Sequence, residues 1–305
     1  MPTQENPVVP SGSCPSCLIP SMYTASSTSM YSPYSPTLDR CAYGEEVARV
    51  VIAQLSDVHI PGAPAEQLAG SNPSDRLKSV LAVASRRSSA VLLTGDLAAT
   101  RGTDDEYRAL RALVADVPVP VWPVAGNHDE ANRLAALFGI SGRNGRCDYF
   151  VDHSGVRVVV LDSSRDKLVG GRLDAEQVDW LDTVLGGASA SLVAIHHPCL
   201  AHDVVSSPSM RLDDPSLEAL GSVISCHEVH AVIGGHAHVP LVGSFAGTTA
   251  IVAPSTAYEF GDRVDGRPTY REGPLQYFEH SWNDDGSGFL SRLVTVSDEV
   301  WRPLT

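Results

Sequence analysis

Five apolar segments of this chain each end in a short polar group that contains Asp, Asn or His. The groups are Ser56–His59, Gly95–Asp96, Gly126–Asp129, His196–Pro198 and Gly235–His238. The first three follow apolar runs that alternate with amphipathic helical patterns, and this alternation predicts βαβ units in a sheet covered on both faces. Ligands of such open sheets bind outside the carboxyl ends of the strands. We therefore expect the five groups to meet at one site.

The second half of the chain has a different pattern, in which hairpins occur in addition to βαβ units. Ser154–Gly155 predicts a hairpin turn, and Asp174 predicts the start of a helix that stops at Gly186–Gly187. Another helix is predicted to have Asp214 as its N-cap and Pro215 at its first position. Later apolar segments predict antiparallel strands, at 248–255, 275–282 and 288–297.

Residues 1–44 differ from the rest of the chain in composition. They are rich in Pro, Ser, Thr and Tyr and lack helical or strand periodicity, which predicts a mostly disordered N-terminal extension. Cys14 and Cys17 form a CxxC with no second pair, so we interpret them as incidental rather than as a zinc site. The folded domain is expected over 45–305, with C-terminal strands and a cap region at about 255–305.

The charge balance limits the possible partners. Among 305 residues, 22 Lys and Arg against 36 Asp and Glu give a net charge of −14, which argues against nucleic acid and anionic membranes as partners. We find neither an apolar run long enough for a transmembrane helix nor a secretory signal pattern. Six scattered cysteines are typical of a reducing compartment. We therefore predict a cytoplasmic protein.

The polar groups at the segment ends favour metal chemistry. Two Asp, one Asn and four or five His suit transition metals such as Mn, Fe, Zn or Co better than Ca or Mg. No GxxxxGK[ST] loop is present, which excludes a P-loop nucleotide hydrolase. The ligands outnumber the needs of one tetrahedral ion, whereas two ions about 3.5–4 Å apart fit them and suit phosphoester cleavage. Two such ions outweigh the carboxylates of Asp57 and Asp96 and attract a phosphate.

The ordered motifs DxH, GD, GNHD, HxP and GHxH resemble the calcineurin-like metallophosphoesterase superfamily over roughly residues 47–255. The segments "VVVLDSS", "GRLDAEQVDWL", "HHP" and "RLDDPSLEALGSVI" are similar to the bacterial class III cyclic-nucleotide phosphodiesterases. The resemblance implies a four-layer α/β/β/α sandwich, with two mixed sheets face to face and helices outside. The later hairpins support this fold independently.

The resemblance also implies a role for each motif residue. The first metal would be held by Asp57, His59 and His238, Asp96 would bridge both metals, and the second would be held by Asn127, His196 and His236. His128 would contact the phosphate and protonate the leaving oxygen, and Asp129 would orient His128 or its loop. Asn127 and His238 would also face the substrate. Whether His196 or His197 is the ligand rests on the HxP spacing alone and stays open.

The implied reaction is attack of a hydroxide between the two metals on a 3′,5′-cyclic nucleotide, which gives the nucleoside monophosphate. The metals would be Mn or Fe/Mn, with Zn or Co as alternatives, and a homodimer is possible. Rival readings are a phosphomonoesterase, a glycerophosphodiesterase, a phosphohydrolase of specialised metabolism, or a scaffold without metals. Substrate choice would lie in the loops 198–214 and 255–275, where Tyr258, Phe260 and Tyr270 either stack on a base or pack.

Other polar residues are interpreted as structural. Asp162 ends the apolar run "VVVLD" and is expected to stabilise a turn or to support the site from behind the ligands. Five histidines outside the motifs are expected to be exposed or hydrogen-bonded: His153, His202, His227, His230 and His280.

Overall fold

The computed structural model describes residues 49–63, 65–165, 168–202, 210–265, 267–283 and 288–297. The extension predicted at 1–44, with Cys14 and Cys17, lies outside the described residues. So does the central part of the predicted 198–214 loop.

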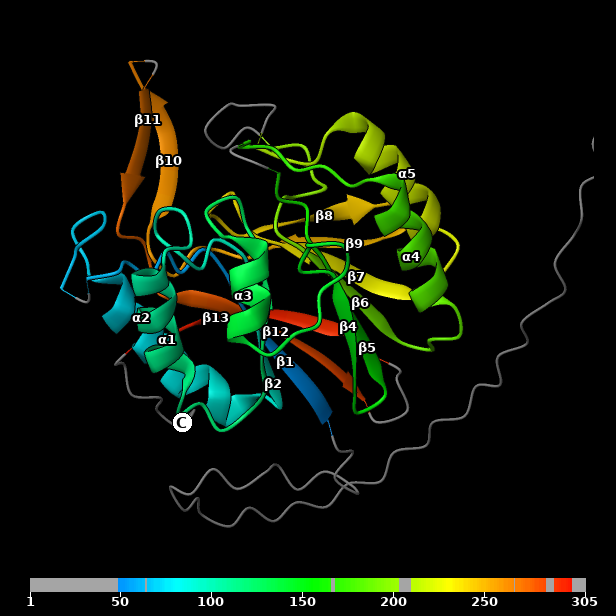
Figure 1. Cartoon of the computed structure of the whole chain (residues 1–305), viewed down its shortest axis with the longest axis horizontal. Helices are drawn as coiled ribbons and strands as arrows, with labels where there is room; N and C mark the ends of the chain where they lie inside the picture. Colours follow the sequence, from blue (N-terminus) through cyan, green and yellow to red (C-terminus); the bar gives the residue numbers. More distant parts are fainter. Residues whose placement is uncertain are drawn as a thin grey trace, which may run out of the picture. The chain divides into compact units, whose positions relative to one another are not determined.

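Within the described residues, the strands form two large mixed sheets and one separate hairpin (Figure 1). The first sheet has the order β13-β12-β1-β2-β3, made of Leu290–Thr295, Gln276–Asn283, Arg49–Leu55, Ala90–Thr94 and Val121–Val124. Strands β1, β2 and β3 are parallel, and β12 and β13 add an antiparallel edge. The predicted βαβ units therefore form this sheet.

The second sheet has the order β4-β5-β6-β7-β9-β8, made of Tyr149–His153, Val156–Leu161, Ser191–Ile195, Val229–Gly234, Thr248–Val252 and Leu241–Phe245. Its central strands β5, β6, β7 and β9 are parallel, and β4 and β8 are antiparallel edges. The hairpin predicted at Ser154–Gly155 is confirmed between β4 and β5. The segment predicted over 248–255 is strand β9, and it pairs parallel to β7 as well as antiparallel to β8.

Five helices are present among the described residues: α1 (Pro73–Arg87), α2 (Asp104–Val114), α3 (Ala131–Leu137), α4 (Ala175–Leu185) and α5 (Asp214–Ile224). The predicted capping box of α2 is confirmed, because Thr103 accepts from the Glu106 amide and the Glu106 side chain returns to Thr103. Asp174 caps α4 as predicted.

The N-cap predicted for α5 is wrong by one residue. Asp213, not Asp214, has the extended cap conformation, and its side chain accepts a hydrogen bond from the Ser216 amide. Pro215 then falls at the second helical position, where its missing N–H still costs no intrahelical bond. Two adjacent Asp residues are equally good caps by sequence, so the register of the first turn decided between them.

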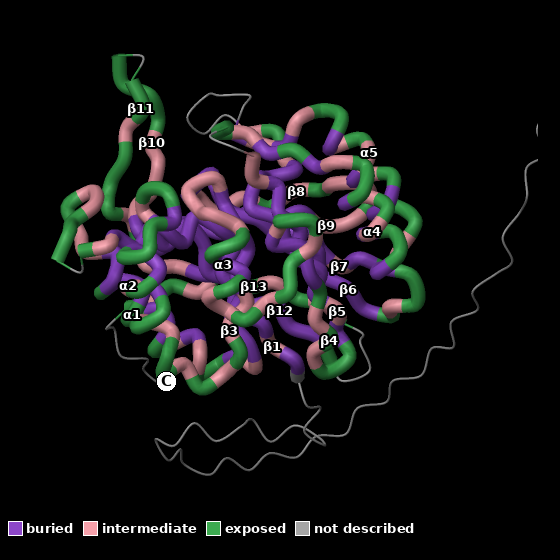
Figure 2. The backbone as a smooth tube through the Cα atoms, in the orientation of Figure 1, coloured by how far each residue is buried: buried purple, intermediate pink, exposed green. Residues whose placement is uncertain are grey.

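Alternate residues of the central strands face two different cores, which confirms the four-layer sandwich. Val158, Val160 and Leu192 belong to the core that includes β1, β2, α1 and α2. Val159 and Val193, one residue along in each strand, belong to the core beneath α4 and α5. The buried segments in Figure 2 follow these strands, and exposed residues lie mainly on the helices and loops. Each sheet is therefore covered by the other sheet on one face and by helices on the other.

A polar contact joins the two sheets inside this core. The Gln54 amide on β1 donates to the Gly234 carbonyl at the end of β7, at 2.7 Å, and to the Thr94 hydroxyl, at 3.1 Å. The Gln54 oxygen accepts from His280 Nε2 at 2.9 Å. Gln54 is completely buried, so these bonds fix how the end of β7 sits against β1.

Candidate metal centre

All seven predicted metal ligands lie in the turns that directly follow β1, β2, β3, β6 and β7. Backbone hydrogen bonds join these turns: the Asp57 amide donates to the Gly95 carbonyl at 3.0 Å, and the Gly235 amide donates to the His196 carbonyl at 2.9 Å. The first bond lies within the first sheet and the second within the second sheet. The His236 amide, after β7, donates to Asp57 Oδ2, after β1, at 2.9 Å, so the carboxyl ends of both sheets meet at one site.

Many of these residues have a left-handed backbone conformation. Positive φ angles occur at Asp57 (50°), His59 (43°), Asp96 (51°), His236 (69°) and His238 (60°). This region is unfavourable for residues with a Cβ, and such strain concentrates where a side chain must be aimed. The sharp turn after each strand therefore directs its Asp or His toward the common site.

Glycines in the motifs make room for the ligands. A Cβ on Gly95 would lie 2.2 Å from His196 Nδ1, and a Cβ on Gly126 would lie 2.2 Å from Asp96 Oδ1. Gly95 also has a φ of +95°, which L side chains rarely adopt. The Gly in the GD and GNHD motifs is thus required for the approach of the residues beside it.

The first ligand group, here called the Asp57 group, consists of Asp57, His59 and His238. One ligand atom of each lies within 4.8 Å of the others. His238 Nε2 is 3.2 Å from His59 Nε2 and 3.4 Å from Asp57 Oδ1. His238 Nδ1 donates to the Tyr258 carbonyl at 2.9 Å, so its Nε2 lone pair faces the site.

Asp96 lies between the two sides of the site, and its oxygens face different partners. Oδ1 is 3.3 Å from His196 Nε2 and accepts from the His128 amide at 2.9 Å. Oδ2 is 3.9 Å from His59 Nε2 and 3.9 Å from His128 Nε2. Asp96 thus has one oxygen toward His196 and the other toward His59.

The second ligand group, here called the Asn127 group, consists of Asn127, His196 and His236. Asn127 Oδ1 and His236 Nε2 are buried and make no hydrogen bond to any described residue, and His196 Nε2 is paired with the Asp96 carboxylate, with Oδ1 at 3.3 Å. His196 Nδ1 donates to the Thr94 carbonyl at 2.8 Å, so its Nε2 faces the site. Buried polar atoms are rarely left without a partner, and this donor set fits a divalent transition metal.

Burial keeps two of these imidazoles neutral, as ligands must be. It lowers the pKa of His59 to about 3 and lowers the pKa of His236 well below its usual value. His196 differs, because Asp96 outweighs burial and raises its pKa to about 9. Burial also opposes ionisation of Asp57, but His238 and His196 hold its pKa at about 2. A cation binding beside His196 would compete with its proton.

His128 and Asp129 have different surroundings. The His128 side chain is 34% exposed, and its Nδ1 donates to the Ala99 carbonyl at 2.9 Å, which leaves Nε2 toward the site. Asp129 instead accepts from the amides of Gly126 (2.9 Å), Leu97 (3.0 Å) and Ala98 (3.0 Å). Asp129 therefore connects the loop after β2 to the loop after β3 through hydrogen bonds. Such contacts position neighbouring residues.

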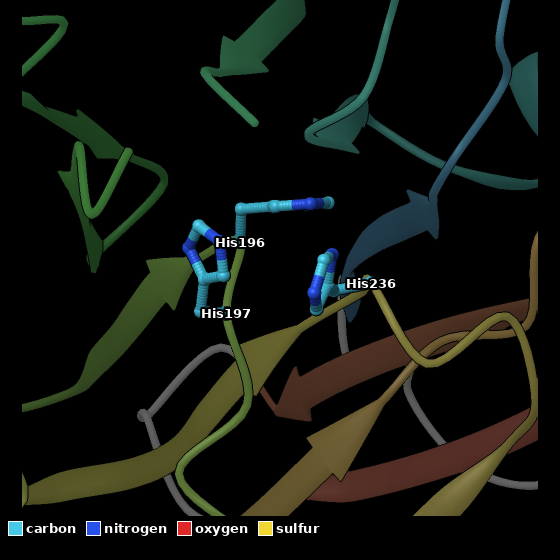
Figure 3. A group of neighbouring side chains, drawn as sticks. All are labelled: His196, His197 and His236. Carbon is cyan, nitrogen blue, oxygen red and sulfur yellow. The ribbon is translucent and has the colours of Figure 1, made fainter. Parts of the chain in front are cut away.

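His197, the alternative to His196 in the HHP motif, also lies at the site (Figure 3). Its ring centroid is 5.0 Å from that of His196 and 4.7 Å from that of His236. One ligand atom of each of the three lies within 4.8 Å of the others. The two readings of the motif are therefore not exclusive.

The residues interpreted as structural have structural contacts. Asp162 accepts from the Ser164 amide (2.9 Å) and the Cys147 amide (3.3 Å), so it stabilises a turn, as predicted. Four of the five other histidines make hydrogen bonds, namely His153, His202, His227 and His280. His230 contacts the rings of Trp282 and Phe289.

The three aromatic residues expected either to stack on a base or to pack have different surroundings. Phe260 stacks on His238, with ring centroids 4.3 Å apart, and Tyr258 lies 4.4 Å from the same imidazole. These two pack behind a ligand. Tyr270 is 66% exposed on the hairpin of β10 (Glu259–Val264) and β11 (Arg267–Arg271). Only Tyr270 of the three is largely open to solvent.

A cavity of about 640 Å³ adjoins the site. Its lining includes Asn127 and His128 and three arginines, Arg101, Arg146 and Arg165. Its volume lies within the roughly 300–1,000 Å³ of small-molecule sites. Arg165 and Gln54 were not singled out from the sequence. A lone amide within the apolar run "VVIAQL" was the available signal for Gln54.

Comparisons with known proteins agree with this geometry. The profile of the calcineurin-like phosphoesterases matches residues 50–240. A probable cyclic nucleotide phosphodiesterase of Synechococcus sp. is 34% identical over 68% of this chain and 81% of its own length. A cAMP/cGMP dual specificity phosphodiesterase of Mycobacterium tuberculosis is 30% identical over 68% of each. These relatives are similar to the chain through most of its folded part.

A solved structure gives the same fold at lower sequence similarity. The crystal structure of a dimetal phosphatase from Danio rerio superposes with a TM-score of 0.55 over 81% of this chain and 99% of its own, at 16% identity. Among the described residues, no helix has the length and apolar character needed to cross a membrane.

Proposed function

The chain belongs to the calcineurin-like phosphoesterase family, and we propose that it hydrolyses a 3′,5′-cyclic nucleotide to the nucleoside monophosphate at a two-metal centre. As a member of this family it is a phosphoesterase. The cyclic-nucleotide substrate and the use of two metals are the parts that we propose.

The observation that carries the proposal is Asp96 between two groups of buried ligands. Its Oδ2 faces His59 of the Asp57 group, and its Oδ1 faces His196 of the Asn127 group. A carboxylate with one oxygen toward each group suits two ions a few ångströms apart, roughly 3.5–4 Å in two-metal hydrolases. A one-metal site would leave one of the two groups without a role.

The bound ions would supply Lewis-acid activation of water and of the phosphoryl oxygens. The protein residues do the rest. Asn127 contributes a neutral carbonyl, which leaves more positive charge for the phosphate than a carboxylate would. His128, partly exposed beside the cavity, presents Nε2 to the phosphate and, when protonated, delivers a proton to the leaving oxygen. Asp129 holds the loop that carries both residues.

The substrate class rests on the relatives and on the cavity. Both relatives described above are named for cyclic nucleotides. The cavity next to Asn127 and His128 has room for a nucleoside as well as a phosphate. Its arginines offer planar donors for phosphate or base oxygens. Mn or Fe/Mn remains our choice of metals, and the cytoplasmic location and homodimer remain predictions.

A substrate panel tests this function. Purified protein loaded with Mn²⁺ would be assayed on cAMP, cGMP, nucleoside monophosphates, a glycerophosphodiester and bis-p-nitrophenyl phosphate, with metal content measured in parallel. We expect two metals per chain and the highest kcat/KM on a cyclic nucleotide. A preference for monophosphates would support the phosphomonoesterase reading instead. Absence of both bound metal and turnover would support the scaffold reading.

A further inference from the structure

We propose that Glu106, in the first turn of α2, is a positioning residue that holds the Ala99–Thr100 peptide group and through it fixes the His128 imidazole. The inference rests on the proposed role of His128 in proton delivery. It adds to the site a residue that lies outside the five motifs and acts through the loop after β2.

Only half of the Glu106 carboxylate serves the helix cap. Oε2 accepts from the Thr103 amide at 2.8 Å and completes the capping box. Oε1 is not needed for this box, and it accepts from the Thr100 amide at 2.6 Å and from the Thr100 hydroxyl at 2.7 Å. Burial opposes ionisation, but the hydrogen bonds from Thr103 and Thr100 outweigh burial and lower the pKa of Glu106. A charged carboxylate therefore holds the Thr100 amide, and hydrogen bonds to charged groups are the strong ones.

The Ala99–Thr100 peptide group connects this carboxylate to the site. A trans peptide group is planar, so its N–H and its C=O point in opposite directions. The Thr100 N–H of this group donates to Glu106, and the Ala99 C=O of the same group accepts from His128 Nδ1 at 2.9 Å. Because the group is rigid, fixing its N–H also fixes the direction of its C=O. Hydrogen bonds in such a chain also polarise one another.

The Ala99 carbonyl can turn unless its peptide group is held. The preceding peptide group is fixed by the Ala99 amide, which donates to the Ile60 carbonyl at 3.1 Å. Rotation about ψ of Ala99 would still redirect the carbonyl, and the bond from Thr100 to Glu106 opposes this rotation. The His128 side chain is 34% exposed, so packing restrains its ring on part of its surface only. The hydrogen bond to Ala99 is thus a main restraint on the orientation of the ring.

The next residue of α2 supports the loop on the other side of His128. The Tyr107 hydroxyl accepts from the Glu130 amide at 2.8 Å and donates to Asp129 Oδ1 at 3.3 Å. A Cβ on Gly102 would lie 2.5 Å from this hydroxyl, so the loop after β2 approaches it only with Gly at that position. The first turn of α2 therefore holds both loops that orient His128.

Glu106→Gln tests the proposal and keeps the helix cap. Gln also completes a capping box, and once its single carbonyl oxygen accepts from Thr103, its NH₂ group faces the Thr100 amide. An NH₂ group cannot accept that hydrogen bond, so the peptide group is released. Asp105→Asn is the matched control, because it changes an exposed carboxylate of the same turn whose partner is Arg108.

Turnover measures the effect on a poor leaving group. In Glu106→Gln, kcat should fall by about tenfold or more, yet by less than the roughly 10²–10⁴-fold contribution of an acid–base group, and metal content should stay unchanged. A residue that acts through His128 has nothing to position in His128→Ala. The double variant should therefore turn over as fast as His128→Ala alone. If Glu106→Gln costs the same factor in both backgrounds, the proposal is overturned.

The ¹⁵N NMR signals of the ring report the same contact without turnover. The full chain would be studied in Zn²⁺, which is diamagnetic, at a pH of about 8, above the usual imidazole value of roughly 6.5. Signals identified by their loss in His128→Ala should show a wild-type ring protonated on Nδ1, and Glu106→Gln should add the form protonated on Nε2. Unchanged signals in Glu106→Gln would contradict the positioning role. A wild type that turns over no member of the substrate panel would refute the proposed function instead, and the ring signals would still decide whether Glu106 positions His128.

Discussion

The two ligand groups of the candidate centre differ in how far the protein satisfies them. Members of the Asp57 group contact one another, with His238 Nε2 3.2 Å from His59 and 3.4 Å from Asp57. In the Asn127 group, Asn127 Oδ1 and His236 Nε2 make no hydrogen bond to any described residue. Both groups have a histidine held from behind by a backbone carbonyl, that of Tyr258 for His238 and that of Thr94 for His196.

The difference indicates how each half of the site gains from a cation. Each unsatisfied buried polar atom costs about 1–3 kcal/mol, and a metal at the Asn127 group relieves this penalty. Metal binding to the folded state alone also stabilises the fold. In the Asp57 group the His238 lone pair lies beside the Asp57 carboxylate, so a cation there relieves repulsion between the ligands.

Removing the Asp96 carboxylate, which both ligand groups share, should disturb both groups at once and have the largest effect on turnover. Asp96→Ala takes a ligand from both groups and removes the charge that offsets repulsion between two cations. We expect turnover to fall by about 10⁴-fold or more, since metal stabilisation is worth several kcal/mol at 1.36 kcal/mol per tenfold. Metal content and kcat measure it, with Asp152→Ala on an exposed carboxylate of β4 as the control. Two bound metals at a near-normal rate would contradict the bridging role.

His128→Ala should leave both ligand groups intact and still lower the rate. A single acid–base group contributes about 10²–10⁴-fold. The loss should appear on a cyclic nucleotide, whose alkoxide needs a proton, and shrink on bis-p-nitrophenyl phosphate, whose phenolate scarcely does. Metal analysis and kcat on both substrates make the test. An equal defect on both would mean that His128 only stabilises charge, and loss of a metal would make it a ligand.

Asn127→Ala should weaken metal binding at the Asn127 group and leave the Asp57 group intact. It removes one ligand atom from the Asn127 group, so the second metal should bind about 10–100-fold more weakly. The turnover rate at low Mn²⁺ concentration should fall accordingly. Excess Mn²⁺ should restore part of that rate, whereas it should not restore the turnover rate of His128→Ala. The measurement is kcat as a function of Mn²⁺ concentration. A defect in Asn127→Ala that Mn²⁺ leaves untouched would place Asn127 on the substrate rather than on the metal.

The sequence predicted the meeting of these groups because one rule covers them all: each follows an apolar strand, and carboxyl ends of parallel strands share an edge. It could not predict how the two sheets face each other, since that depends on core packing and on the Gln54 contact with Gly234. The position of His197 was also hidden, because it depends on the bend after Ile195 and on the space at Gly171.

Short elements were missed for a related reason. Helix α3 has only seven residues and carries Glu130 as its N-cap, and the exposed hairpin β10–β11 shows little alternation of polar and apolar residues. Such elements are specified by their contacts more than by periodicity, as tertiary context overrides weak local preference. The same limit explains the one-residue error at Asp213 and Asp214.

The smallest expected effect concerns the contact that aligns the two sheets beneath the site. His280 donates from Nε2 to the Gln54 oxygen and lies 2.8 Å from the Ser291 hydroxyl through Nδ1, which suits a neutral ring. Burial lowers the pKa of His280 to about 3. An unfolded His titrates near its usual value of about 6.5. The stabilisation from His280 is therefore complete above that value and is lost as pH falls from there toward 3.

The size of this loss follows from linkage. At 1.36 kcal/mol for each unit of pKa difference, lowering the pH to 5 should cost about 2 kcal/mol of folding free energy through this group alone. Denaturant unfolding of chelated wild type and His280→Gln at pH 7 and pH 5 isolates it, because other buried histidines contribute equally to both proteins. The variant should lose less stability than the wild type over that interval. If both lose the same amount, His280 is not held neutral, and the link from Gln54 to the β7 end of the site does not depend on it.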